Sequence, residues 1–231
     1  MFSNNENKKV LIVASHPDDE VLGCGGTISK FIKNNYKVYV YFSHEGSSSR
    51  YENYNNLKAI KEIEKRNRMA LNCTKILGHK IVGFGKNVNL RNENFSLLDN
   101  VKKISEIIKK IKPFIIITHH HDDINEDHQI TFKIVTNAVR PPANYLVKRL
   151  YLMEIPSTTD WTIRSSFKPN VFIDISGEIK KKIRAIKVYK TELNKYPHSR
   201  SEKNLISHSI YRGAQVGLKN TEAFEVYRII F

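Results

Sequence analysis

We expect an α/β protein with a Rossmann-like, mostly parallel sheet flanked by helices on both faces. Three observations predict this fold class. Short apolar runs rich in β-branched residues recur along the chain, as in strands that are buried on both faces. Stretches with apolar residues at three- and four-residue spacing lie between these runs and predict helices. No composition shift, repeat or low-complexity tract divides the 231 residues, so we expect a single domain over residues 1–231.

The first half of the chain alternates predicted strands with predicted helices. Continuous apolar runs predict strands at Val10–Ala14, Val38–Phe42 and Phe114–Thr118. Apolar spacing predicts helices at Thr27–Asn34, Leu57–Leu71 and Leu97–Lys112. This alternation is typical of parallel sheets whose strands are joined by helices.

The second half of the chain is less regular but contains the same two kinds of segment. Strands are predicted at Leu146–Ile155, Asn170–Ile175 and Glu222–Ile230. Helices are predicted at Glu178–Tyr189 and Glu202–Val216. We expect the last strand to close the sheet.

The charge balance is strongly basic, with 38 Lys and Arg against 23 Asp and Glu and a formal charge of +15. Such a charge is compatible with nucleic acid, an anionic membrane surface or a phosphorylated substrate. The positive residues are mostly lysines scattered along predicted helices, where a solvated charged face is typical. No zinc-finger spacing, RNP-like aromatic segment or basic arm accompanies them, so we expect no nucleic-acid partner.

The cysteines and the N-terminal residues favour a cytoplasmic location. Cys24 and Cys73 stand far apart, and the first ten residues lack the apolar segment of a secretory signal. The longest apolar runs have the length of strands and are much shorter than the ~20 residues that span a bilayer. We therefore expect no membrane span, and leave open whether the protein forms a homo-oligomer.

Three glycines in the segment Gly23–Gly26 raise the question of a phosphate-binding loop. A GxGxxG pattern that starts at Gly23 requires glycine at its sixth position, which is Ile28. The nucleotide interpretation therefore fails on spacing. We expect these glycines to allow a sharp turn and close packing of a helix on the sheet.

Charged and polar residues crowd the segment directly after the first predicted strand. Ser15–Glu20 contains one histidine and three carboxylates in a row of six residues. Open α/β sheets bind ligands at the carboxyl ends of their strands, where this segment lies. Any one of these residues has an ordinary structural role, for example an aspartate that caps the following helix. The whole run indicates a functional site.

A second polar segment, His119–His128, follows the predicted strand Phe114–Thr118 and so has the same position in the sheet. A segment this dense in imidazoles and carboxylates costs stability through charge crowding unless something compensates, and a divalent cation does so. Two histidines and one aspartate with a fourth, open position form a catalytic zinc arrangement. A structural zinc site would have four protein ligands, usually with cysteine, and Cys24 and Cys73 have no CxxC partner.

At these two segments the chain resembles the PIG-L/LmbE family of zinc-dependent N-deacetylases. The family carries Ala-His-Pro-Asp-Asp-Glu after its first strand, matched by Ser15–Glu20 with Ser in place of Ala. It also carries an Asp-His pair after a later strand, matched by Asp127-His128. Weaker matches extend over most of the chain, at His44–Gly46, Tyr189–Glu192, His198–Ser201, Arg212-Gly213 and Glu222–Phe224. The resemblance implies the LmbE-like fold.

Carried over residue by residue, the resemblance implies that His16, Asp19 and His128 bind Zn²⁺, or another divalent metal, and that Asp18 is the general base. Adjacent side chains in a turning segment point in different directions, so Asp18 and Asp19 can face different groups. The resemblance implies that Asp127 supports an imidazole instead of binding the metal.

The chain departs from well-studied relatives three residues before the last metal ligand. Those relatives have a histidine that stabilises the oxyanion, whereas this chain has Asn125. An asparagine can donate a hydrogen bond but cannot carry a positive charge. His119, His120 and His198 are candidates for the missing function, and Asp123 is a further candidate for a supporting or substrate-binding residue.

The function that these observations favour is removal of an acetyl group from an N-acetylated sugar or sugar conjugate. The sequence leaves open a free sugar, a glycoside, a nucleotide sugar or a glycolipid. Two alternatives are a sugar-binding or regulatory protein of the same fold without catalysis and, less favoured, a basic nucleic-acid-binding protein.

Two segments rich in Ser, Thr, Asn and Tyr, Ser43–Tyr54 and Ser157–Ser166, are expected to line the pocket. Trp161 is expected either at the rim of the site or as a packing anchor. Arg50, Arg164 and Arg200 are expected to be solvated surface residues or contacts to a substrate phosphate.

Overall fold

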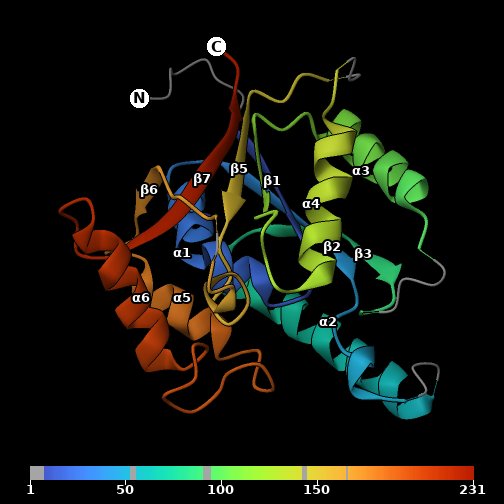
Figure 1. Ribbon diagram of the computed structural model, residues 1–231, viewed down its shortest axis with the longest axis horizontal. Coiled ribbons are helices and arrows are strands. Elements are labelled where there is room, and N and C mark those ends of the chain that lie inside the picture. Colours follow the sequence, from blue (N-terminus) through green and yellow to red (C-terminus); the bar gives the residue numbers. More distant parts are fainter. Residues whose placement is uncertain (1–7, 53–55, 91–94, 142–144, 165) are drawn as a thin grey trace.

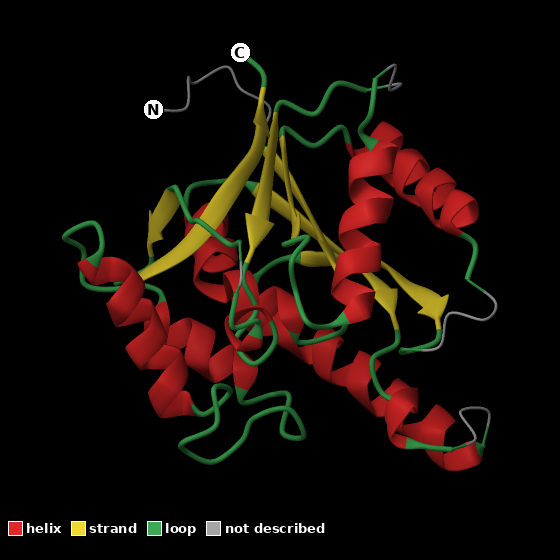
Figure 2. Ribbon diagram, viewed as in Figure 1, coloured by secondary structure: helices red, strands yellow, loops and turns green. Residues whose placement is uncertain are grey.

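Seven strands form one sheet in the order β3-β2-β1-β4-β5-β7-β6 (Figures 1 and 2). The structure is a computed structural model and describes residues 8–52, 56–90, 95–141, 145–164 and 166–231. The strands are β1 (Lys9–Ala14), β2 (Lys37–His44), β3 (Lys80–Asn87), β4 (Ile115–His119), β5 (Arg149–Met153), β6 (Val171–Asp174) and β7 (Thr221–Ile229). The helices are α1 (Asp19–Lys33), α2 (Leu57–Leu77), α3 (Leu97–Ile111), α4 (Glu126–Ala138), α5 (Ile179–Ile186) and α6 (Glu202–Ala214).

Helices cover both faces of the sheet because the central strands are apolar on both faces. In β1, Val10 and Ile12 belong to one hydrophobic core and Leu11 and Val13 to the other. The first core also contains residues of α1, α2, α5 and α6, and the second contains residues of α3 and α4. The alternation follows from the two-residue period of a strand. The predicted fold class is therefore confirmed.

The order of the strands reverses between β1 and β4, which makes their carboxyl ends the topological switch point of the sheet. β1 pairs in parallel with β2 on one side and with β4 on the other, with Val13 opposite Thr118. β7 is antiparallel to both β5 and β6. In sheets of this kind the switch point is where ligands bind. Both polar segments that the sequence singled out follow these two central strands.

Three elements differ from the sequence-based expectation. The edge strand β3 and the helix α4 were not predicted, and α1 begins at Asp19, eight residues before the predicted start at Thr27. The segment Gly23–Gly26 thus lies inside α1, where Cys24 has non-helical backbone angles and kinks the helix. Asp127 and His128 lie in the first turn of α4, whereas the sequence suggested a loop.

Within the described residues, no helix is long and apolar enough to cross a membrane. The sheet runs without a break through both halves of the chain. That the 231 residues behave as a single domain in solution remains a prediction.

Candidate metal centre and active site

The two polar segments meet because β1 and β4 are parallel neighbours. The backbone N–H of Ser15, the first residue after β1, donates a hydrogen bond of 2.8 Å to Nε2 of His119, the last residue of β4. The Ser15 hydroxyl lies 2.7 Å from that of Thr131 in α4. The segment after β1 is thus fixed against β4 and the helix that follows it.

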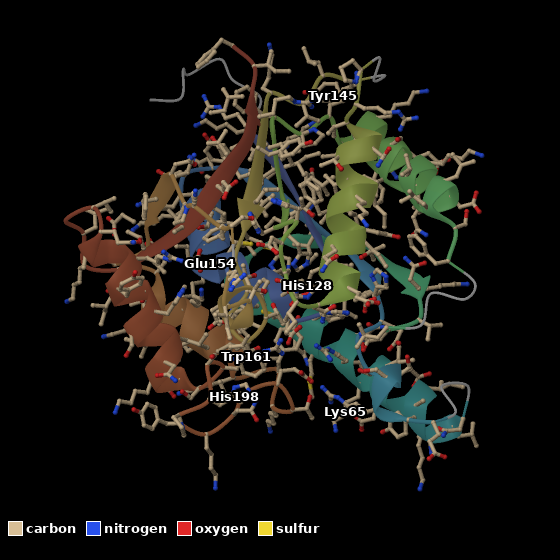
Figure 3. The ribbon with its side chains drawn as sticks, in the orientation of Figure 1. Lys65, His128, Tyr145, Glu154, Trp161 and His198 are labelled. Carbon is tan, nitrogen blue, oxygen red and sulfur yellow. The ribbon has the colours of Figure 1, made fainter. Side chains whose placement is uncertain are left out.

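His16, Asp19 and His128 form a buried cluster in which one ligand atom from each residue lies within 4.8 Å of the others. Oδ2 of Asp19 is 3.3 Å from Nδ1 of His16 and 3.3 Å from Nε2 of His128. His16 lies in the turn after β1, Asp19 at the start of α1 and His128 in the first turn of α4. Figure 3 labels His128 at the lower end of α4, near the middle of the view.

Each histidine of the cluster uses its second nitrogen to contact a carboxylate. Nε2 of His16 donates a hydrogen bond of 2.8 Å to Oδ2 of Asp127. Nδ1 of His128 lies 3.1 Å from Oδ2 of Asp123. Such partners fix the orientation and tautomer of a metal-binding imidazole. They leave Nδ1 of His16 and Nε2 of His128 directed toward Asp19.

These residues fit a divalent cation. Among the described residues, Oδ1 of Asp19 and Nε2 of His128 are buried and have no hydrogen-bond partner. Buried polar atoms of this kind are rare in proteins unless an ion or water satisfies them. Burial lowers the pKa of His128, but Asp19 and Asp123 outweigh it and raise that pKa to about 10. The cluster therefore has a negative potential that a cation would neutralise.

Asp18 is held apart from the cluster by two arginines. Its Oδ1 accepts a hydrogen bond of 2.8 Å from Nη2 of Arg66, and its Oδ2 accepts one of 3.1 Å from Nη1 of Arg200. Burial raises the pKa of Asp18 above its ordinary value, while Arg66 and Arg200 oppose that shift. The carboxylate is thus held by two guanidinium donors.

The backbone at Asp18 has an unusual conformation, with φ 135° in a residue other than glycine. The Asp18 N–H donates a hydrogen bond of 2.9 Å to Oε2 of Glu20. The hydroxyl of Tyr189 donates one of 2.6 Å to Oε1 of the same side chain. Because such angles cost energy unless the surroundings enforce them, Glu20 and Tyr189 stabilise the turn that separates Asp18 from Asp19.

Glu192 completes the group around Asp18. It lies 3.3 Å from Nη1 of Arg66 and 3.5 Å from Nη1 of Arg200, and accepts a hydrogen bond of 2.8 Å from Arg50. Arg50 is exposed, as expected of a surface residue, and pairs with Glu192, whereas Arg200 is half-buried between Asp18 and Glu192. Arg164 is exposed.

Three further candidate residues lie in different places. His119 stacks on the ring of His128, with 3.9 Å between ring centroids. Asn125 caps α4, since its side chain accepts a hydrogen bond of 2.9 Å from the Asp127 N–H. His198 contacts the ring of Trp161, and its Nδ1 accepts a hydrogen bond from the Arg200 N–H. His119 thus lies against the cluster, Asn125 lies at the start of α4 and His198 lies on the loop before α6.

Sequence reasoning missed several residues of the site. Arg66 lies in the middle of α2 among exposed lysines, so nothing in the local pattern marks it as buried. Asn89 follows the edge strand β3, and its Nδ2 donates a hydrogen bond of 2.7 Å to Asp127. Thr158 and Thr159, by contrast, lie in the predicted pocket wall Ser157–Ser166, and both donate hydrogen bonds to Asp123. Of the two predicted walls, residues 53, 54 and 165 lie outside the described residues.

Fold and site together define an α/β protein with a buried cluster that suits a metal ion at the switch point of its sheet. The model of the PIG-L family, GlcNAc-PI de-N-acetylase, matches residues 11–139, which is more than half of the chain. The chain therefore belongs to the PIG-L family, as its motifs predicted.

Individual proteins are also similar to this chain in sequence or in structure. The chain is 26% identical over 239 residues to the diacetylchitobiose deacetylase of Thermococcus kodakarensis, covering 98% of this chain and 86% of that protein. The structure of N,N′-diacetylchitobiose deacetylase from Pyrococcus horikoshii, complexed with its inhibitor MPG, has a TM-score of 0.75 at 21% identity, covering 95% and 83% of the two chains. GalB, the 4-carboxy-2-hydroxymuconate hydratase of Pseudomonas putida, has a TM-score of 0.76 at 18% identity, covering 96% and 97%. These two structures show the fold alone.

Proposed function

We propose that the protein is a zinc-dependent hydrolase that removes an acetyl group from the amine of an N-acetylated sugar or sugar conjugate. The observation that carries this proposal is the different surroundings of Asp18 and Asp19. Asp19 faces two histidine nitrogens and has an unpaired oxygen, while Asp18 is held by two arginines. The two consecutive carboxylates would thus have different roles: Asp19 binds the metal, and Asp18 transfers protons.

His16, Asp19 and His128 would hold the metal. Two imidazoles and one carboxylate are a ligand set that catalytic zinc sites use. A bound Zn²⁺ supplies Lewis-acid polarisation of the amide carbonyl and lowers the pKa of water toward ~7. Asp123 and Asp127 hold the two imidazole rings in the orientation that this requires.

Asp18 acts as the general base and then as the general acid. Its carboxylate takes a proton from the water whose oxygen bonds to the acetyl carbon. The bond between that carbon and the amide nitrogen then breaks, and the proton passes from Asp18 to the departing amine. Acetate and a free amine leave the site. Arg66 and Arg200 keep the carboxylate in place through both transfers.

The substrate class rests on the relatives and on the lining of the site. The Thermococcus kodakarensis relative is a diacetylchitobiose deacetylase, whose substrate is an N-acetylated sugar. The segment Ser157–Ser166, rich in Ser and Thr, is held beside the cluster because Thr158 and Thr159 donate hydrogen bonds to Asp123. Hydroxyl-rich surroundings suit a polyhydroxylated ligand.

The test is release of free amine from N-acetylglucosamine, N,N′-diacetylchitobiose and UDP-N-acetylglucosamine, measured with a fluorogenic amine reagent. Zinc-reconstituted protein is compared with chelator-treated protein. We expect zinc-dependent release from at least one of the three. If no free amine is released from any of the three sugars while one zinc is bound per chain, the result would contradict the proposal and favour a sugar-binding protein without catalysis.

A further inference from the structure

We propose that Trp161 and His198 form an aromatic platform at the rim of the site, on which a second sugar ring of the substrate stacks. This inference rests on the proposed function and deepens it. It implies that the preferred substrate is an oligosaccharide or glycoside in which a further pyranose ring follows the acetylated one.

The first observation is the exposure of Trp161. It lies in the 3-10 turn η2 (Thr159–Trp161) and is 51% exposed, although indole is among the largest apolar side chains. A packing anchor would be buried, so that alternative for Trp161 is excluded. An exposed tryptophan at the rim of a site offers a flat face to a ligand.

The second observation is that the indole is held in a fixed orientation. Nε1–H donates a hydrogen bond of 3.1 Å to Oγ of Ser199. The ring of His198 packs against it at 65°, with 5.5 Å between centroids. Nδ1 of His198 in turn accepts a hydrogen bond of 3.0 Å from the Arg200 N–H. A pre-oriented ring binds a ligand with less loss of conformational entropy than a mobile one.

The third observation is that both sides of the platform are connected to the reactive residues. Three residues before Trp161, the Thr158 hydroxyl donates a hydrogen bond of 3.0 Å to Asp123, the partner of His128. Next to Ser199, Arg200 contacts Asp18 at 3.1 Å. In Figure 3, Trp161 and His198 lie beside each other, on the side of His128 that faces away from Tyr145. The platform therefore borders the site that would hold the acetamide.

A pocket of about 300 Å³ adjoins the two segments that carry the platform. Its lining includes Asp160, Ser199, Asn204 and the exposed ring of Tyr211. Asp160 adjoins Trp161 in sequence, and Ser199 holds the indole. Hydrogen-bonding groups beside exposed aromatic rings match a sugar, whose hydroxyls bind polar groups and whose C–H face packs on the negative face of an aromatic ring.

Fluorescence offers a direct test, because Trp161 is the one tryptophan in the sequence. We would titrate zinc-loaded Asp18→Asn protein, which should not turn over, with N,N′-diacetylchitobiose and with N-acetylglucosamine. We expect a saturable change in indole emission, with an apparent Kd about tenfold lower for the disaccharide. An emission spectrum that does not change at saturating disaccharide would overturn the proposal.

Kinetics of Trp161→Ala provide the second arm. We expect KM for the disaccharide to rise about tenfold while kcat/KM for the monosaccharide changes less than about twofold. Trp161→Phe should retain most of the affinity, because it keeps an aromatic face. Tyr196→Ala is the matched control, since Tyr196 is also an exposed aromatic residue, at 59%, on the loop between α5 and α6 that carries His198. Equal losses for both sugars in Trp161→Ala would refute the platform.

The two arms separate this inference from the proposed function. A fluorescence response without amine release from any sugar would support the platform and contradict the deacetylase proposal. Amine release that depends on zinc, but is insensitive to Trp161→Ala, would support the deacetylase proposal and overturn the platform.

Discussion

Asp18 and Asp19 are chemically identical neighbours whose surroundings give them different properties. Asp19 begins α1 and faces two imidazole rings, whereas Asp18 precedes the helix, has φ 135° and faces two guanidinium groups. The turn between them, held by Glu20 and Tyr189, is what directs the two carboxylates apart. The function of each aspartate therefore depends on its neighbours, the imidazoles around Asp19 and the guanidinium groups around Asp18, as well as on the sequence motif.

The carboxylates behind the histidines should control metal affinity. Asp123→Asn removes the negative partner of His128, and we expect zinc affinity to fall about 10–100-fold. Competition with a fluorescent zinc chelator measures the change. The neighbouring Asp122→Asn is the matched control, because Asp122 accepts a hydrogen bond from the Ser166 N–H instead. Equal zinc affinity in the parent and Asp123→Asn would show that Asp123 does not support His128.

Arg66 should be important for stability. It is 5% exposed and lies between two carboxylates, Asp18 and Glu192. Arg66→Met leaves both without this partner, and we expect a loss of about 3–5 kcal/mol in the free energy of unfolding. Arg68→Met, two residues further along α2 with a side chain that is 66% exposed, should change it by less than about 1 kcal/mol. Urea unfolding compares the two variants, and similar midpoints would contradict the assignment.

At the scale of single residues, the sequence predicted the site residues that belong to a motif but not those that long-range packing brings to the site. His16, Asp19 and His128 are brought together as the motifs suggested. Arg66 was missed because its burial depends on the turn at Gly46, whose carbonyl it contacts, and on Glu192, which is 126 residues away in the chain. Neither contact leaves a pattern in the local sequence.

At the scale of elements, strands and helices with strong periodicity were predicted, and those with a mixed pattern were not. β3 contains Gly83 and Gly85, which have low strand propensity, and it lies at an edge of the sheet. α4 begins with Glu126-Asp127-His128, and its polar first turn resembles the loop before it. The start of α1 was hidden by the glycines around Cys24, since glycine disfavours helix.

Those glycines have a packing function that can be measured. A Cβ at Gly26 would lie 2.8 Å from Ile175, so Gly26→Ala forces α1 away from the strands beneath it. We expect a loss of about 1–3 kcal/mol in the free energy of unfolding, as for other overpacked cores. Gly177→Ala is the matched control, because a Cβ there has no neighbour within 4 Å. Equal unfolding midpoints for the two variants would argue against close packing at Gly26.

At the scale of the whole molecule, the sheet joins the two halves of the chain. β4 pairs with β5, and β5 pairs with β7, so residues near both ends of the chain share one hydrophobic core. We expect one cooperative unfolding transition, with a ratio of calorimetric to van't Hoff enthalpy of about 1. Differential scanning calorimetry of chelator-treated protein measures it, and two resolved transitions would contradict the prediction of a single domain.

The central claim is the division of labour between Asp18 and the cluster of His16, Asp19 and His128. The most direct test measures zinc content and kcat on the same samples of parent and Asp18→Asn protein, with the exposed Asp99→Asn as control. The account predicts one zinc per chain in all three proteins and a fall in kcat of at least about 100-fold in Asp18→Asn alone. Turnover by Asp18→Asn at the parent rate, or loss of its zinc, would contradict the account.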